Sequence, residues 1–175
     1  MSLLKTVSPE NAEGEIADAY SFFTKSGLPV PKPLEMASAS PGLLKIQNQM
    51  LGYYMNHQSL GFALLSLIRY LVAKKYDYVF CTSFNENFLK MQGMDEEQIK
   101  TVEADPSKAP IEDKDREMLI FVMKAIENPD TVTQEDMDNL QKVGWTDQDI
   151  FDALNHGAGM IGPSILMKAF KMDTC

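Results

Sequence analysis

The stretch that most constrains the fold runs over residues 60–92 and reads LGFALLSLIRYLVAKKYDYVFCTSFNENFLKMQ. Apolar residues recur at helical spacing on almost every side of its first half. A helix that is apolar all round is normally surrounded by other helices. The stretch therefore predicts a buried helix over about 60–76, a polar break at KKYDY, and a second helix over about 81–92.

Capping signals divide the rest of the chain into further helices. Ser8-Pro9 and Ser40-Pro41 each combine a capping residue with a proline suited to the first helical position. Residues 28–33 hold three prolines and are expected to be extended. No alternating strand pattern occurs, so the sequence predicts an all-α fold. Its remaining helices are expected over about 9–26, 34–38, 41–56, 95–103, 114–127, 133–143 and 146–170.

The last predicted helix contains an unusual segment at residues 157–163, GAGMIGP. Three glycines and a proline interrupt an otherwise helical pattern there. Such a segment predicts a kink, or a face against which another backbone packs very closely.

Length and charge limit the class of protein. A chain of 175 residues fits one domain, with residues 1–32 forming an N-terminal helix and strap and residues 33–175 the main helical domain, both in one structural unit. The net charge is −9 and the 16 basic residues are scattered, which argues against nucleic acid. There is no signal-peptide pattern and no apolar run long enough for a bilayer, so we expect a cytoplasmic protein without a membrane partner.

Cys81 is the first candidate for chemistry. It is expected at or near a helix N-terminus, where unpaired N–H groups and the helix dipole favour the thiolate. Asn85 lies one turn later on the same face. No histidine, cation or second cysteine stands nearby in the sequence, which favours a buried structural cysteine instead. Alternatively, a capping box at 83–86 starts this helix later and leaves Cys81 in the preceding turn.

The other ionisable residues give weaker signals. His57 is expected to cap a helix end, and His156 to lie in the core or at an interface, although both are possible bases. The acidic clusters fall at predicted helix starts, where the dipole favours them. No metal-ligand spacing and no phosphate loop occurs, so we expect neither a metal nor a cofactor. Cys175 is expected to be an incidental thiol on a frayed tail.

The order of these segments resembles the alkylhydroperoxidase D-like / carboxymuconolactone decarboxylase superfamily, in particular its peroxidase-related single-domain proteins. The likeness spans about residues 33–170. It is carried by MASASPGLLKIQNQML (36–51), LLSLIRYLVAKKYDYVFC (64–81), FLKMQGMDEEQIKTV (88–102) and GWTDQDIFDALNHGAGMIG (144–162). The resemblance implies an all-α helical bundle that assembles into a homodimer, trimer or hexamer.

Active members of this superfamily carry a Glu about a dozen residues before Cys-x-x-Cys, followed after three residues by His. On this chain the second cysteine matches Cys81. The first cysteine falls on Tyr78, the His on Asn85 and the Glu on Ser66. Three of the four groups that run the peroxidase cycle in the family are therefore replaced.

The resemblance leaves several functions open. The first is a catalytically degenerate protein that binds a small apolar or peroxide-like ligand in a pocket lined by Ser66, Tyr78, Cys81 and Asn85. The second is a one-cysteine thiol peroxidase that uses Cys81, an external reductant and a histidine base. A carboxymuconolactone decarboxylase-like enzyme and a purely structural or interaction protein are the remaining alternatives.

Overall fold

The computed structural model describes residues 2–172, and over these residues it contains helices and turns without a strand. The prediction of an all-α fold is confirmed. The α-helices are α1 (Gly14–Lys25), α2 (Lys32–Ala37), α3 (Pro41–Met55), α4 (Phe62–Lys75), α5 (Val79–Met91), α6 (Glu96–Ala104), α7 (Asp113–Glu127), α8 (Gln134–Lys142), α9 (Asp147–Ala158) and α10 (Ile161–Ala169). Short 3₁₀ turns lie at η1 (Pro9–Asn11), η2 (Pro106–Lys108) and η3 (Pro129–Thr131).

The chain divides into two compact units. One comprises Met1–His57 with Ile165–Cys175, and the other comprises Gln58–Ser164. This division does not follow the boundary at residues 32 and 33 that we used for the sequence, and that assignment of domains stays a prediction.

The first unit is built on α1, α2 and α3, with α3 packed against both of the others. The N-terminal segment is fastened to it by hydrogen bonds. The Val7 N–H donates to Ser38 Oγ at 2.7 Å, and the Tyr20 hydroxyl donates to the Val7 carbonyl at 2.9 Å. The Leu3 N–H also donates to the Phe170 carbonyl at 3.0 Å, so both ends of the described chain belong to this unit.

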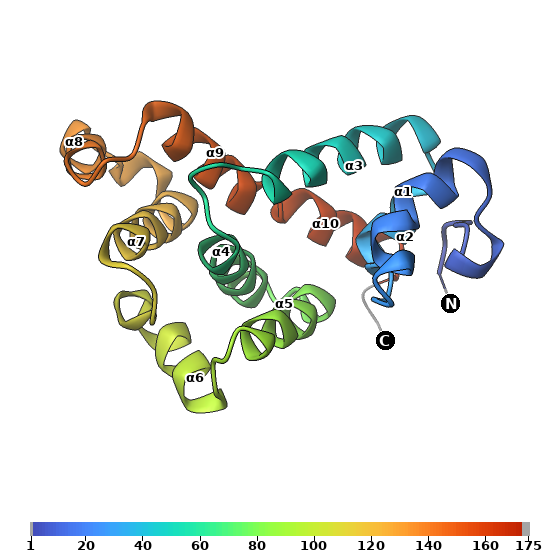
Figure 1. Cartoon of the computed structure of the whole chain (residues 1–175), viewed down its shortest axis with the longest axis horizontal. Coiled ribbons are helices and arrows are strands. Elements are labelled where there is room, and N and C mark those ends of the chain that lie inside the picture. Colours follow the sequence, from blue (N-terminus) through green and yellow to red (C-terminus); the bar gives the residue numbers. More distant parts are fainter. Residues whose placement is uncertain (1, 173–175) are drawn as a thin grey trace. The chain divides into compact units, whose positions relative to one another are not determined.

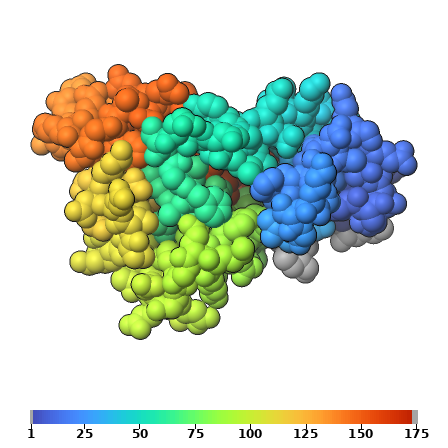
Figure 2. Space-filling model, in the orientation of Figure 1, coloured from blue at the N-terminus to red at the C-terminus, as the bar shows by residue number. Residues whose placement is uncertain are grey.

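The second unit is organised around α4, which α5, α7 and α9 contact (Figure 1). This arrangement follows from the sequence of α4, in which nine of the fourteen residues are buried. Leu64 and Ile68 are fully enclosed, as expected for a helix that is apolar on nearly every side. In the space-filling view, residues of α5 and α6 form much of the visible surface of this unit (Figure 2).

Two sequence predictions about the N-terminal region were wrong. The helix expected from Pro9 is only the turn η1, and α1 begins at Gly14. Residues 12 and 13 are extended, and Gly14 then takes a φ of +53°, which glycine adopts more readily than other residues. The extended strap is also shorter than expected, because α2 already begins at Lys32.

The glycine-rich segment breaks the last predicted helix into α9 and α10. A Cβ built on Gly157 would lie 2.7 Å from Ile126 Cδ1 and 3.1 Å from Ile68 Cγ2. Both atoms belong to side chains of the second unit, so glycine permits the close packing of α9 there. The predicted interruption of the helix is confirmed, whereas the atoms that approach Gly157 belong to side chains and not to another backbone.

Of the helices formed by residues 2–172, none combines the length and the apolar character needed to cross a bilayer.

Candidate functional site

The residues predicted to line a pocket meet inside the second unit, around a side chain that the sequence did not single out. Ser66 lies on α4, Tyr78 is the N-cap of α5, and Cys81 and Asn85 lie on α5. Their exposed fractions are 0% for Ser66, 1% for Tyr78, 7% for Cys81 and 1% for Asn85. Arg69 on α4 joins Ser66 and Asn85 to His156 on α9, and we call Ser66, Arg69, Asn85 and His156 the arginine cluster.

Arg69 donates one hydrogen bond from each of its three nitrogens. Its Nε donates to Asn85 Oδ1 at 2.8 Å, its Nη2 donates to Ser66 Oγ at 3.1 Å, and its Nη1 lies 3.1 Å from His156 Nε2. A guanidinium carries five N–H groups. One N–H on each terminal nitrogen therefore has no acceptor among residues 2–172.

The charge of Arg69 is not balanced by an acid. Across residues 2–172, no carboxylate lies within ion-pair distance of its guanidinium, and its hydrogen-bond partners carry no formal charge. Burial lowers the pKa of Arg69 to about 10, which still leaves the group cationic at neutral pH. A cation that is partly removed from water without an opposite charge is costly, and most proteins avoid it.

His156 is held as a neutral acceptor. Arginine only donates hydrogen bonds, so the contact at 3.1 Å requires an unprotonated Nε2 and assigns the ring proton to Nδ1. Burial first, and then the charge of Arg69, lowers the pKa of His156 to about 3, while a hydrogen bond with the Leu65 backbone opposes the shift. The lone pair that a general base would use is directed at Arg69.

Asn85 has both ends of its amide engaged. Its Nδ2 donates to the Cys81 carbonyl at 2.8 Å, and its Oδ1 accepts from Arg69. Asn85 therefore orients the guanidinium, and it ties the first turns of α5 to α4. An amide is not able to take up a proton at neutral pH, so this residue positions its neighbours.

Cys81 is the third residue of α5, within its first turn, as one of the two alternatives from the sequence predicted. The other alternative, a helix start at residues 83–86, was wrong, since α5 begins at Val79. The reactivity of Cys81 stays a prediction. Burial raises the pKa of Cys81 to about 11, against smaller lowering effects of Tyr78 and of the Arg69 charge.

Aromatic rings border the arginine cluster. The Phe62 ring centroid lies 5.8 Å from Arg69 Cζ, a cation–π distance. Phe62 also meets Phe88 edge-on at 5.6 Å, and Phe88 meets Phe84 at 4.8 Å, with Phe80 stacked on Phe84 at 5.8 Å. Phe62 is 54% exposed and the other three rings are half-buried, so the series leads from the guanidinium to the surface of the second unit.

The remaining candidates lie elsewhere or outside the described residues. His57 follows the C-terminal end of α3 in the first unit, edge-on to Tyr53 at 5.5 Å. Its role as a base stays a prediction. Cys175 lies outside residues 2–172. Within those residues, no group of three or more His, Cys, Asp and Glu side chains is arranged to hold a metal ion.

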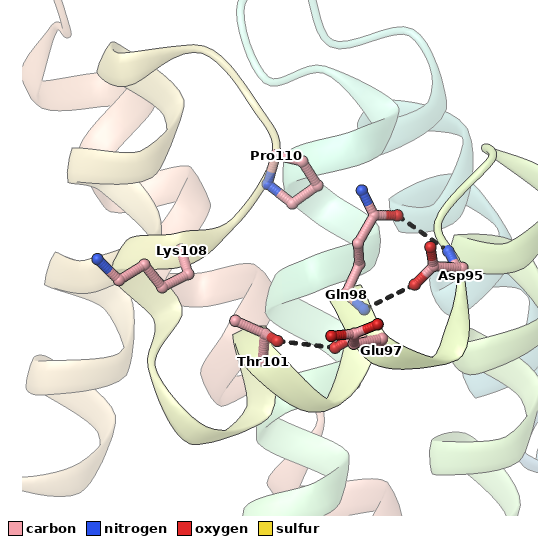
Figure 3. A pocket seen from close by; sticks show the side chains of 6 residues that line it. All are labelled: Asp95, Glu97, Gln98, Thr101, Lys108 and Pro110. Atoms are coloured by element: carbon pink, nitrogen blue, oxygen red, sulfur yellow. Dashed lines mark hydrogen bonds between the residues drawn. The ribbon is translucent and has the colours of Figure 1, made fainter.

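A depression of about 200 Å³ lies on α6 and η2 (Figure 3), and no residue of the arginine cluster lines it. Its polar side chains serve the helix itself. The Gln98 N–H donates to Asp95 Oδ1 at 2.8 Å, and the Asp95 N–H donates to Gln98 Oε1 at 3.0 Å, which completes a capping box. Thr101 Oγ1 donates to the Glu97 carbonyl at 2.8 Å. These bonds engage the side chains of Asp95, Gln98 and Thr101 within α6 itself.

Arg69 is the residue that sequence reasoning missed. Its signal was present, because Arg69 is the one charged residue in the apolar part of α4, ahead of Lys74 and Lys75 in the last turn, and a charge there is costly to bury. What the sequence could not reveal was its partner on α9, which lies 87 positions away in the chain.

The fold is that of alkylhydroperoxidase D-like proteins. The chain superposes with a TM-score of 0.77 on the crystal structure of an alkylhydroperoxidase AhpD core, an uncharacterized peroxidase-related protein from Ralstonia eutropha JMP134. The match covers 98% of this chain and 90% of that one at 18% sequence identity.

A second solved structure, an uncharacterized peroxidase-related protein from Silicibacter sp. TM1040, gives a TM-score of 0.75 at 18% identity, with 98% and 93% of the two chains covered. No protein-family model and no curated protein matches the sequence. The expected resemblance is thus confirmed as a shared fold.

Proposed function

We propose that this protein has kept the alkylhydroperoxidase D-like fold but binds a small ligand at the arginine cluster in place of reducing peroxides. The observation that carries the proposal is the state of Cys81. Its thiol is buried, its pKa is raised to about 11, and the position of the partner cysteine is held by Tyr78. A thiol must ionise before it attacks a peroxide or a disulfide.

The neighbouring groups support the same reading. His156, the one histidine of the second unit, accepts from Arg69 through Nε2 and has a pKa of about 3. Asn85 and Ser66 stand where the family has its His and Glu, and both accept from Arg69. Proton relay through these positions is therefore replaced by hydrogen bonds that hold one guanidinium in place.

The test is the reaction of reduced protein with excess hydrogen peroxide and with an alkyl hydroperoxide, followed by intact mass. Cys175→Ser isolates Cys81, and Cys81→Ser provides the blank. We expect Cys81 to oxidise no faster than a free cysteine. Fast oxidation that depends on Cys81 would instead favour a one-cysteine peroxidase with an external reductant, for which the Arg69 charge would be the activating group.

We further propose that the protein is a homo-oligomer that uses one face of α3. Leu43, Ile46, Met50 and Tyr53 are exposed there at 45% to 60%, and their spacings of three, four and three residues place them in one stripe. Sedimentation of the wild type and of Ile46→Glu tests this. A wild type that sediments as a monomer at micromolar concentration would contradict it.

A further inference from the structure

We infer that the ligand of the arginine cluster is a small monocarboxylate with an apolar, preferably aromatic, body. The inference rests on the proposed binding function and specifies its ligand class. It follows from two independent features of the second unit, namely the uncompensated charge of Arg69 and the aromatic series that begins beside it.

The first feature selects an anion. Arg69 is half-buried and has neutral partners on all three nitrogens, so its charge lacks a counterpart within residues 2–172. It also retains one N–H on each terminal nitrogen. These are the donors that pair with the oxygens of a carboxylate in charge-assisted hydrogen bonds.

The single positive charge of Arg69 favours a ligand with a single negative charge. The neutral His156 adds no second cation, and Ser66 and Asn85 carry none. One positive charge is balanced by one carboxylate, whereas a phosphate dianion would bring an excess negative charge into a site that already penalises charge. Phosphate is therefore disfavoured.

The second feature selects the body of the ligand. Phe62 lies over the guanidinium, and Phe88, Phe84 and Phe80 continue the aromatic series along one side of α5. Their partly exposed rings offer edge and face contacts to an apolar group whose carboxylate reaches Arg69. A carboxylate that lacks an apolar group would not make these contacts with the phenylalanine rings.

The experiment compares benzoate, its neutral isostere benzamide, and acetate by titration calorimetry with the full chain. The variants are Arg69→Met and, as a matched control, Lys74→Met, which removes an exposed cation from the same helix. We expect benzoate to bind wild type and the control alike. Benzamide and acetate should each bind the wild type about tenfold or more weakly than benzoate does. The Arg69→Met variant should bind benzoate about tenfold or more weakly than the wild type does.

If the Arg69→Met variant does not fold, an NMR measurement on the wild type tests the same inference. The nitrogen NMR signal of His156 Nε2 in wild type reports on the guanidinium that it contacts. We expect benzoate to shift this signal saturably and benzamide to leave it in place.

The outcomes separate the two proposals. Equal binding of benzoate and benzamide would overturn the carboxylate inference and leave small-ligand binding standing. Absence of benzoate binding would also overturn it. The claim that peroxide chemistry is lost is judged separately, by the oxidation rate of Cys81.

Discussion

The reactivity of Cys81 offers the sharpest prediction. Burial raises the pKa of this thiol from 9.0 to about 11. At neutral pH the thiolate population falls tenfold for each unit of pKa, so two units reduce it about a hundredfold. A thiolate of higher pKa is the better nucleophile, which restores about tenfold of the rate. The exchange rate of Cys81 at neutral pH should therefore be about tenfold below that of an ordinary thiol. Limited access lowers it further, because the side chain is only 7% exposed.

The assay is thiol exchange with the uncharged reagent 4,4′-dithiodipyridine on Cys175→Ser protein, followed by absorbance. Between pH 6 and 9.5 the rate constant should rise tenfold per pH unit without a plateau, because the titration midpoint lies near pH 11. Circular dichroism at each pH verifies that the protein stays folded. The same variant unfolded in urea should plateau near the ordinary thiol pKa and exchange faster at pH 7.

A plateau below pH 9 in the folded protein would refute the reasoning. So would a rate at pH 7 equal to that of the unfolded chain. Either result would mean that the Arg69 charge and the N-terminus of α5 outweigh desolvation, and the one-cysteine enzyme would become the preferred function.

The remaining predictions concern stability, measured by urea unfolding. His156 has a folded pKa of about 3, below its ordinary 6.5, so the unfolded chain takes up the proton first. As pH falls from 6.5 towards 3, the wild type should lose at most about 1.4 kcal/mol per pH unit more than His156→Gln; parallel pH profiles would contradict this. Gly157→Ala should destabilise by about 1–3 kcal/mol through overpacking at 2.7 Å, whereas Gly52→Ala, with nothing within 4 Å, should stabilise by up to about 1 kcal/mol. Equal effects of the two changes would be inconsistent with close packing of α9. Thr146→Ala removes the acceptor of the Asp149 N–H at 3.1 Å and should cost about 1 kcal/mol, and an unchanged midpoint would show that this cap is dispensable.

Local signals in the sequence were sufficient for the order and type of the helices. The apolar pattern of α4 predicted a surrounded helix, and Thr146 with Asp149 predicted the start of α9 with its capping box. Such signals act within one or two turns of the chain, so they survive without knowledge of the fold. They failed near Pro9, where two extended residues separate a turn from α1.

The candidate site was predictable only in part. The family resemblance identified positions 66, 78, 81 and 85, and these positions do lie on two helices that pack together. Their chemistry was not readable from spacing. The resemblance assigned Ser66 and Asn85 to the positions of the family's Glu and His, but only the structure showed that both side chains accept from Arg69.

The sequence by itself determined that the chain is helical and where most helices begin and end, and it placed Cys81 at or near a helix start. Tertiary structure decided the charge states. A pKa depends on what excludes water and on which charges approach, and these neighbours come from helices far apart in the chain. The packing of α9 on α4 brings His156 to Arg69, and burial makes Cys81 a weak acid despite its helix terminus.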